Sequence, residues 1–201
     1  MNFTGERPFD GQELKSSRMR YKAILPFVCK KKVLDFGCGV GYGSFFLDHF
    51  ANFVVGLDRN REAIAIAKNQ FPKIDFYHSR EELKYLYEFQ TVVAVESIEH
   101  LEKVELEEAL AFFSKHIPEF VATTPNGDRF VYRPLRFEDR RGFHVWHYQL
   151  DELQELFLRY YRFVEILGTA IGRERACDSY LVFASNSIAW DDNWLTQINI
   201  E

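Results

Sequence analysis

Short runs of apolar residues alternate along the chain with segments whose apolar residues recur every three or four positions. Short continuous runs are typical of buried strands, and the wider spacing is typical of helices that cover one face of a sheet. We expect strands at Val33–Phe36, Phe53–Leu57, Ile74–Tyr77, Thr91–Val95, Phe120–Thr123, Phe163–Leu167 and Tyr180–Ala184. We expect helices at Leu14–Val28, Gly41–Phe50, Glu81–Glu88, Val104–Phe113 and Leu150–Tyr160, and one that Asn60 caps and that runs to Phe71.

The order of these elements predicts a three-layer α/β sandwich, with helices on both faces of a mostly parallel sheet. Thr91–Val95 is apolar throughout, as a strand buried on both faces should be. The link between the last two strands is polar, contains a glycine and has no helical period. We therefore expect a terminal hairpin with an antiparallel last strand. In the helix after the first strand, we expect Phe45, Phe46 and Phe50 to face the core.

The composition fits one soluble globular domain and argues against some classes of protein. Of the 201 residues, 47% are apolar and 27% are charged, and the formal net charge is −5. This acidic balance argues against a protein that binds duplex nucleic acid over a broad basic face. The sequence has neither a charged-then-apolar leader nor an apolar run of about 18 residues, so we expect no secretion signal and no membrane span.

Cysteine usage and segment composition suggest a compartment and an organisation for the chain. Cys29, Cys38 and Cys177 are widely spaced and match no metal-binding or redox spacing, so we expect a cytoplasmic protein. We expect residues 1–30 to form an N-terminal lid or helix, and residues 31–201 to form a single domain. Within that domain we interpret 125–148 as a substrate insert, because most of it is irregular. The sequence does not indicate an oligomeric state.

A glycine-rich turn that follows the first expected strand is the main chemical signal of the chain. Asp35 stands in that strand, and the glycines Gly37, Gly39, Gly41 and Gly43 follow it. The second expected strand ends in another acid, Asp58. Glycines let the backbone pass close to a ligand, and the helix after the turn offers free N–H groups. Two strands that end in acids, with glycines between them, indicate a βαβ unit that binds a nucleoside.

Three interpretations of this unit predict different ligands. A dinucleotide such as NAD would place its pyrophosphate on the turn. However, Tyr42 stands where that fingerprint has a third glycine, and Asp35 would repel a phosphate. S-adenosylmethionine (SAM) carries a ribose, an amine and a sulfonium but no phosphate, so it suits both acids. The third interpretation is a tight strand-to-helix turn that binds nothing.

Several motifs resemble those of the class I SAM-dependent methyltransferases. Val33–Gly43 resembles the first motif of this superfamily, and Gly56–Asp58 resembles the second. Further motifs resemble a subgroup of small bacterial and phage methyltransferases that are often linked to surface-glycan or other small-molecule modification. They are Thr4–Arg7 with Arg20-Tyr21, Val95–Leu101, Thr123–Asn126 and Phe143–Tyr148. The resemblance implies a Rossmann-like fold, with a seven-stranded, mostly parallel sheet whose last strand is antiparallel.

The same resemblance implies SAM as the cofactor and suggests which residues bind it. Asp35 and the glycines would line the methionine end of SAM, and Asp58 would bind the ribose. The adenine would lie near Ser79, while Glu96 and Ser97 would lie beside the sulfonium. The implied cofactor residues are Asp35, Gly37, Cys38, Gly39, Gly41, Asp58, Arg59, Ser79, Glu96 and Ser97.

Methyl transfer to an oxygen also needs a group that accepts a proton. Histidine is the usual candidate because its charge changes near neutral pH. His100 follows the fourth expected strand and His144 follows the long irregular stretch, and these regions should converge over the sulfonium. We therefore expect both as catalytic residues of a methyltransferase that acts on an oxygen of a small-molecule or glycan-like acceptor. We assign no metal ligands.

Two alternatives stay open. Glu96, Glu99, His100 and His144 also resemble the metal site of the small-RNA 3′-terminal ribose 2′-O-methyltransferases. The chain is acidic and shows no RNA-binding appendage, so nucleic acid is not the partner that we expect. The second alternative is a non-catalytic SAM-binding scaffold.

The insert also carries a group of arginines that either form a salt-bridged surface or bind an anionic substrate. Guanidinium groups suit phosphate and carboxylate, and neighbouring aromatic residues would suit a flat or sugar ring. The arginines are Arg129, Arg133, Arg136, Arg140 and Arg141.

Overall fold

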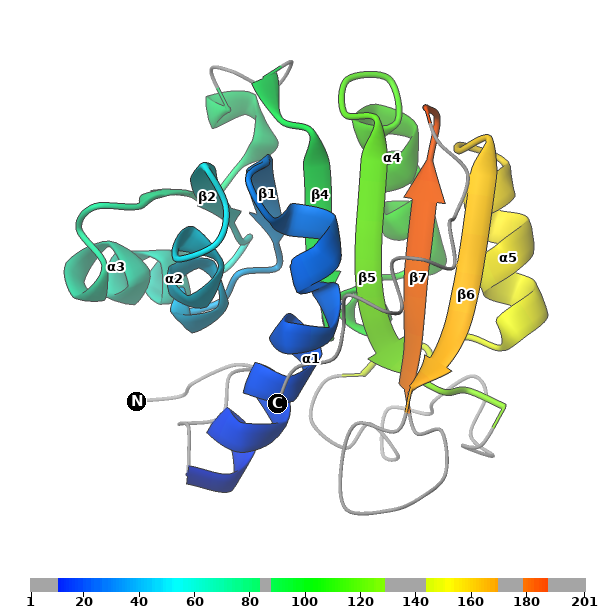
Figure 1. The fold of residues 1–201 in the computed structure, drawn as a ribbon, viewed down its shortest axis with the longest axis horizontal. Helices are drawn as coiled ribbons and strands as arrows, with labels where there is room; N and C mark the ends of the chain where they lie inside the picture. The colour runs from blue at the N-terminus through cyan, green and yellow to red at the C-terminus, as the bar shows by residue number, and fades with distance from the viewer. Residues whose placement is uncertain (1–10, 84–87, 129–143, 170–178, 188–201) are drawn as a thin grey trace.

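A computed structural model describes residues 11–83, 88–128, 144–169 and 179–187, and within them a seven-stranded sheet has the order β3-β2-β1-β4-β5-β7-β6 (Figure 1). β7 runs antiparallel to β5 and β6, and the other neighbouring strands are parallel. The predicted fold class, a mostly parallel Rossmann-like sheet with an antiparallel last strand, is therefore confirmed. The strands are β1 (Lys32–Phe36), β2 (Phe53–Leu57), β3 (Asp75–Tyr77), β4 (Thr91–Val95), β5 (Glu119–Pro125), β6 (Phe163–Thr169) and β7 (Ser179–Ser185).

The described helices begin and end close to their predicted positions, and several have side-chain caps. Asn60 accepts hydrogen bonds from the backbone N–H groups of Glu62 and Ala63 at 3.0 and 3.2 Å, which confirms it as an N-cap. None of the described helices is both long enough and apolar enough to cross a membrane. The helices are α1 (Gly11–Val28), α2 (Tyr42–Asp48), α3 (Arg61–Gln70), α4 (Lys103–Phe113) and α5 (Leu150–Leu158), with 3₁₀ turns η1 (Arg80–Glu82) and η3 (Ile98–His100).

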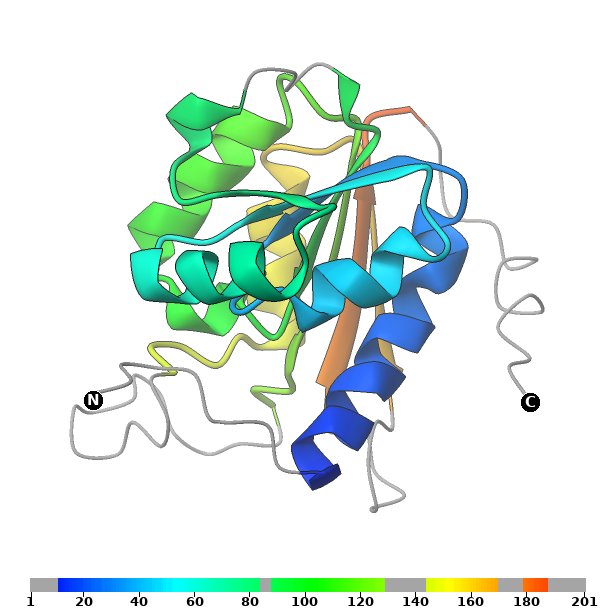
Figure 2. The same cartoon turned by 90° about the vertical axis from the view of Figure 1, so that its left-hand side faces the viewer.

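Alternate residues of the central strands divide the core between the two faces of the sheet. On one face, Val93, Val121 and Phe183 pack with side chains of α1 and α2. On the other face, Phe120 and Val182 belong to a larger cluster that includes side chains of α4 and α5. Figure 2 shows the sheet with α1 and α2 on one side and α4 and α5 on the other. The central strands are thus buried on both faces, as their continuous apolar runs predict.

A third, smaller cluster packs α3 against β3 and the glycine-rich turn. Phe76 of β3 and Ala67 of α3 belong to it, together with the buried thiol of Cys38. Phe76 reaches this position because Gly56 in the neighbouring strand has no side chain. Gly56 therefore sets how closely β3 and the turn approach each other.

Two predictions about local structure were wrong. In α2 the buried residues are Gly43, Ser44 and Leu47, whereas Phe45 and Phe50 are 44% and 40% exposed. The buried face of α2 is narrow because Gly43 packs directly on Tyr21 of α1. Phe45 and Phe50 therefore lie outside the core, while Phe46 is half-buried beside Tyr21.

The second wrong prediction is the helix at Glu81–Glu88. The 3₁₀ turn η1 ends where Leu83 adopts an extended backbone with φ −70° and ψ 100°, so the predicted helix is interrupted, and Glu88 again has a 3₁₀ conformation. The Leu83 side chain packs against the large core cluster, and this contact takes the chain out of the helical path. Residues 84–87 lie outside the described part. At the N-terminus, α1 begins at Gly11, earlier than predicted, and the lid role of residues 1–30 stays a prediction.

We predict that Gly56→Ala destabilises the fold through its clash with Phe76. The added methyl group would overlap the Phe76 ring and lie 2.8 Å from the Cys38 sulfur. Overpacking of this kind costs about 1–3 kcal/mol of unfolding free energy, which urea denaturation measures. In a Phe76→Leu background the same substitution should cost less. An equal cost in both backgrounds would contradict the assignment of the clash.

Candidate functional site

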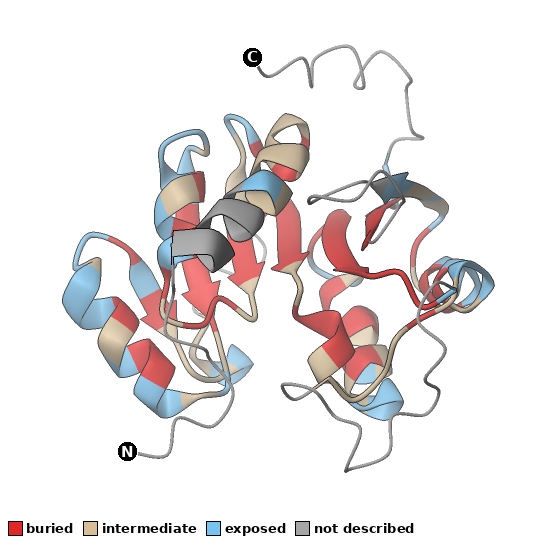
Figure 3. Cartoon of the chain, turned by 90° about the horizontal axis from the view of Figure 1, so that it is seen from below, coloured by how far each residue is buried: buried red, intermediate tan, exposed pale blue. Residues whose placement is uncertain are grey.

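The candidate site lies where β1, β2, β4 and β5 end, at the lower edge of the sheet in Figure 1. Ligands of open α/β sheets bind outside the carboxyl ends of the strands, near the point where the strand order reverses. Here the order reverses between β1 and β4. Figure 3 looks onto this edge and shows buried strands that lead into partly buried turns.

The glycine-rich turn leaves β1 beside the end of β2. Phe36 and Leu57 are partners in the sheet, so Gly37 and Asp58 continue the chain side by side. The backbone N–H groups of Gly37 and Cys38 both donate to the Leu57 carbonyl, at 2.8 and 3.2 Å. These bonds fix the turn against the end of β2.

Gly37 and Gly41 are required as glycines by their backbone conformation. Gly37 has φ 78°, and a Cβ atom there would overlap the Ser97 side chain. Gly41, the N-cap of α2, has φ 87°. Both values lie in the left-handed region that glycine adopts without steric cost.

Asp58 joins the glycine-rich turn to the start of α3. Its Oδ2 accepts a hydrogen bond from the Gly39 N–H at 2.9 Å, and its Oδ1 accepts one from the Asn60 N–H at 2.8 Å. A carboxylate has about four acceptor positions, so each oxygen keeps one that these two bonds do not use. The arrangement suits a ribose, whose two hydroxyl groups can donate to one carboxylate.

Asp35 is fully buried in β1, below the start of the turn. The Ser44 hydroxyl in α2 donates to its Oδ2 at 2.7 Å, while its Oδ1 has no hydrogen-bond partner among the described residues. Burial raises the pKa of Asp35 to about 7, the Ser44 hydrogen bond lowers it and the charge of Asp58 raises it. Sequence reasoning missed Ser44, although its place in the first turn after the glycines was a usable signal.

Glu96 and Ser97 follow β4 and lie next to the turn. Ser97 donates from its hydroxyl to the Phe36 carbonyl at 3.0 Å. Glu96 has a left-handed backbone with φ 50°, which is uncommon for a residue with a side chain. Its carboxylate lies 3.3 Å from the Arg20 guanidinium of α1, a contact that sequence reasoning missed. Asp35, Gly37, Asp58, Glu96 and Ser97 are therefore brought together.

The structure gives Arg59, Ser79 and Cys38 different positions around this centre. Arg59 is exposed and lies 3.1 Å from the Glu105 carboxylate in α4. Ser79 caps η1 just beyond the end of β3 and bonds the Glu81 side chain. Cys38 is buried under the turn. Its thiol packs in the α3 cluster, and its backbone N–H belongs to the turn.

Glu99 is fully buried in η3 and holds the end of the insert in place. Its backbone carbonyl accepts hydrogen bonds from the N–H groups of Val145 and Trp146, at 2.7 and 3.1 Å. Thr124 of β5 donates to the Glu99 Oε2 at 3.2 Å. Burial and the nearby charge of Glu96 raise the pKa of Glu99 well above its ordinary value.

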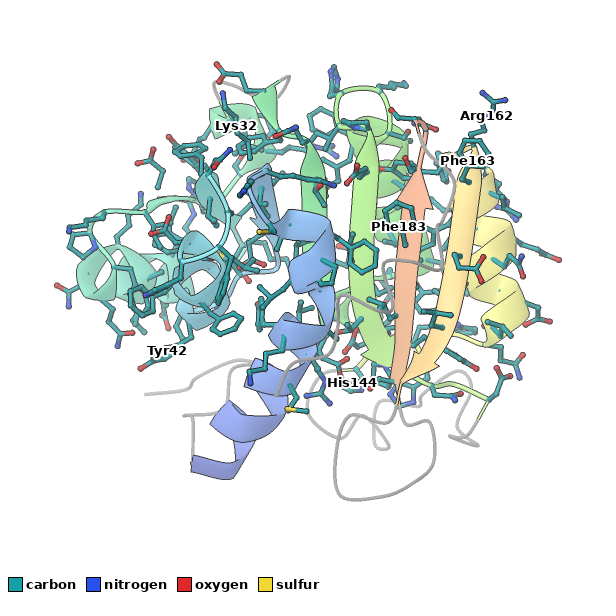
Figure 4. The ribbon with its side chains drawn as sticks, in the orientation of Figure 1. Lys32, Tyr42, His144, Arg162, Phe163 and Phe183 are labelled. Atoms are coloured by element: carbon teal, nitrogen blue, oxygen red, sulfur yellow. The ribbon has the colours of Figure 1, made fainter. Side chains whose placement is uncertain are left out.

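His144 lies at the lower edge of the sheet in Figure 4, next to Glu99 and His100. The rings of His100 and His144 meet edge to face, with centroids 4.9 Å apart. His144 Nε2 is 4.0 Å from the Glu99 Oε1, and its Nδ1 is 2.7 Å from the His147 Nε2. The two histidines predicted as catalytic residues are therefore neighbours. His147 adds a contact that its three-residue spacing from His144 could have indicated.

The two ends of the proposed substrate insert are tied together. The Gly127 N–H donates to the Tyr148 carbonyl at 2.9 Å, and the Leu150 N–H donates to the Asp128 carboxylate at 2.9 Å. Tyr180 of β7 also donates to Asp128. Residues 129–143 lie outside the described part of the chain, and so do the five arginines of the insert.

The fold and this site suit a nucleoside ligand, and comparison with known proteins gives the family of the chain. A family described as Methyltransferase domain matches residues 12–161, well over half of the chain. The chain therefore belongs to this family of methyltransferase domains.

Similar proteins agree with this assignment. The chain is 27% identical over 161 residues to a Mycolicibacterium smegmatis protein named "Probable S-adenosylmethionine-dependent methyltransferase". The match covers 76% of this chain and 62% of that protein, and a Mycobacterium tuberculosis relative is covered to 60%. The chain thus spans about three fifths of the length of the curated relatives that it matches.

Solved structures show the same fold at low sequence identity. An S-adenosylmethionine-dependent methyltransferase from Mesorhizobium loti is 17% identical, with a TM-score of 0.66 over 85% of this chain and 97% of that one. The methyltransferase domain of bacterial CtHen1-C is 19% identical, with a TM-score of 0.63 over 85% and 96%. At these identities the likeness is one of fold.

We predict that Asp35→Asn changes how stability depends on pH. The wild-type carboxyl titrates at about 7 when folded, against an ordinary 3.8, so the folded state binds the extra proton between these values. Stability therefore falls as the pH rises through that window, and asparagine removes this loss. From about pH 5 to about pH 8, the variant should gain on the wild type by on the order of 1–4 kcal/mol.

Urea denaturation at each pH measures this difference. Asp48→Asn, at an exposed position of α2, serves as the control and should follow the wild type at every pH. A difference between Asp35→Asn and the wild type that does not change with pH would show that the Asp35 titration was assigned wrongly.

Proposed function

We propose that this protein is a SAM-dependent methyltransferase that transfers a methyl group to an oxygen of a small-molecule or glycan-like acceptor. SAM supplies a methyl group on a positively charged sulfur. The chain's own residues have to bind the nucleoside, align the acceptor and receive its proton. Alignment of two reactants can supply roughly 7–11 kcal/mol in favourable cases.

The observation that carries the proposal is the hydrogen bond from the Gly39 N–H to the Asp58 carboxylate. In a dinucleotide site, the backbone N–H groups of the glycine-rich turn would face a pyrophosphate. Here the Gly39 N–H already donates to the Asp58 carboxylate, and the buried acid Asp35 stands in β1, just before the turn. The negative charge of the Asp58 carboxylate disfavours a phosphate. It suits the amine and sulfonium of SAM, and Asp58 suits the ribose.

The remaining cofactor assignments are proposals of the same kind. We assign the methionine end to the turn at Gly37, Gly39 and Gly41, and the neighbourhood of the sulfonium to Glu96 and Ser97. Their support is the packing of Gly37 on Ser97. Ser79, beyond β3, is the proposed neighbour of the adenine.

The support for an oxygen acceptor is the pair of imidazoles beyond β4. The rings of His100 and His144 are in contact at the carboxyl edge of the sheet. His100 stands three residues after Ser97, and His144 lies in the part of the insert that returns to the sheet. An imidazole beside an acceptor hydroxyl can take its proton as the O–C bond forms. The hydrogen bond to His147 fixes the orientation of the His144 ring.

An RNA acceptor is not favoured by these observations. The CtHen1-C domain is distant in sequence, and its likeness covers only the fold. The net charge of the whole chain is −5, which does not favour a polyanion.

We predict that the wild-type protein binds SAM but not NAD in calorimetric titrations, and that Asp58→Ala weakens SAM binding. Loss of a hydrogen bond to a charged group costs about 1.5–3 kcal/mol, which corresponds to about a 10–100-fold rise in Kd. Asp48→Ala, at an exposed acid of α2, is the control and should bind SAM like the wild type. NAD binding, or an unchanged SAM affinity of Asp58→Ala, would refute the ribose assignment.

We predict that a His100→Ala/His144→Ala double variant still binds SAM but loses turnover. A positioned base contributes about 10²–10⁴-fold to a rate. Formation of S-adenosylhomocysteine is measured against a panel of hydroxylated sugars and phenols. His49→Ala, which removes an exposed imidazole from α2, should leave turnover unchanged. Full activity of the double variant would remove both proposed bases.

A further inference from the structure

A buried carboxylate oxygen beyond β4 lacks a hydrogen-bond donor. Glu99 is fully buried, and while its Oε2 accepts from Thr124, its Oε1 has no hydrogen-bond partner in the described part of the chain. An ionised carboxylate without a partner is costly to bury. A cation next to the Glu99 Oε1 would offset this cost.

The imidazoles of two histidines lie close to the Glu99 carboxylate. The ligand atoms of Glu99, His100 and His144 all lie within 4.8 Å of one another. The His144 Nε2 lies 4.0 Å from the Glu99 Oε1, which is too long for a hydrogen bond. Two metal–ligand bonds of about 2.1 Å place their ligand atoms up to about 4.2 Å apart, so the gap suits an ion between them.

The surroundings keep the three groups in this arrangement. Val145 and Trp146 donate to the Glu99 carbonyl and so fix the segment next to His144 on η3. The His147 ring bonds the Nδ1 of His144 and leaves its Nε2 toward Glu99. Metal-bound histidines usually have their second ring nitrogen bonded in this way, which sets the tautomer and the ring orientation.

We propose that Glu99, His100 and His144 bind one divalent cation at the carboxyl edge of the sheet. One carboxylate and two imidazoles suit first-row ions such as Mn²⁺, Co²⁺ or Zn²⁺. Three protein ligands leave coordination positions for oxygen atoms from water or from an acceptor. Binding draws the ligand atoms slightly inward from their present separations.

The role of the ion rests on the proposed function, although its binding does not. With an acceptor hydroxyl on an open position, the ion would lower the pKa of that hydroxyl, as metal ions do for bound water, and the hydroxyl proton would pass to solvent water as the O–C bond forms. His100 and His144 would then hold the ion, and this role would replace the direct base role given to them under the proposed function. This interpretation departs from the sequence expectation, which assigned no metal ligands.

The test is a titration of the metal-free full chain with Mn²⁺ alone, followed by calorimetry and by electron paramagnetic resonance of the free ion. We expect one ion per chain for the wild type. Glu99→Gln keeps the shape of the side chain but removes its charge, and it should weaken binding by at least tenfold, as should His144→Ala. His78→Ala is the matched control, because His78 also lies beside a glutamate, Glu82, at 2.6 Å. This control should bind Mn²⁺ like the wild type.

The possible outcomes separate the two proposals. Absence of stoichiometric binding by the wild type, or equal binding by the wild type and His144→Ala, overturns the metal site. Should Glu99→Gln not fold, as thermal melting would show, the decision rests on His144→Ala, whose ring is half-buried. SAM titrations in the presence of EDTA test the proposed function independently, so either proposal can fail while the other stands.

Discussion

The carboxylate of Asp58 connects the glycine-rich turn, the end of β2 and the start of α3. It accepts from Gly39 in the turn after β1 and from Asn60 at the start of α3. Because Asp58 directly follows β2, its hydrogen bonds hold the glycine-rich turn, the end of β2 and the start of α3 next to one another. The bonds at Gly37 and Cys38 to the end of β2 complete this connection. The proposed contacts of the ribose therefore depend on the position of this one side chain.

Buried acids give the candidate site its electrostatic character. Asp35 and Glu99 are both fully buried, and burial is the main reason why each pKa is raised. Each also has one carboxylate oxygen without a hydrogen-bond partner in the described residues. A positive charge beside either acid would stabilise its ionised form.

The sheet could be predicted from the sequence because its strands are continuous apolar runs, and Asp58 could be found because it ends one of them. The exposed face of α2 could not, since phenylalanines such as Phe45 read as core residues in any pattern of apolar spacing. Pairs distant in the chain were also missed. Arg20 meets Glu96 only after α1 crosses the sheet, and nothing local to either residue signals that contact.

The contact between Tyr21 and Gly43 has a consequence for the first helix. Tyr21 occupies the space that any side chain at Gly43 would need, so the Tyr21 ring of α1 packs directly against the α2 backbone at Gly43. A helix that packs only through apolar stripes can slide along its neighbour by a turn. Here the contact between Tyr21 and Gly43 fixes the position of α1 along its own axis. It thereby also fixes where Arg20 meets Glu96 at the end of β4. The position of the first helix therefore determines where Arg20 stands beside the candidate site.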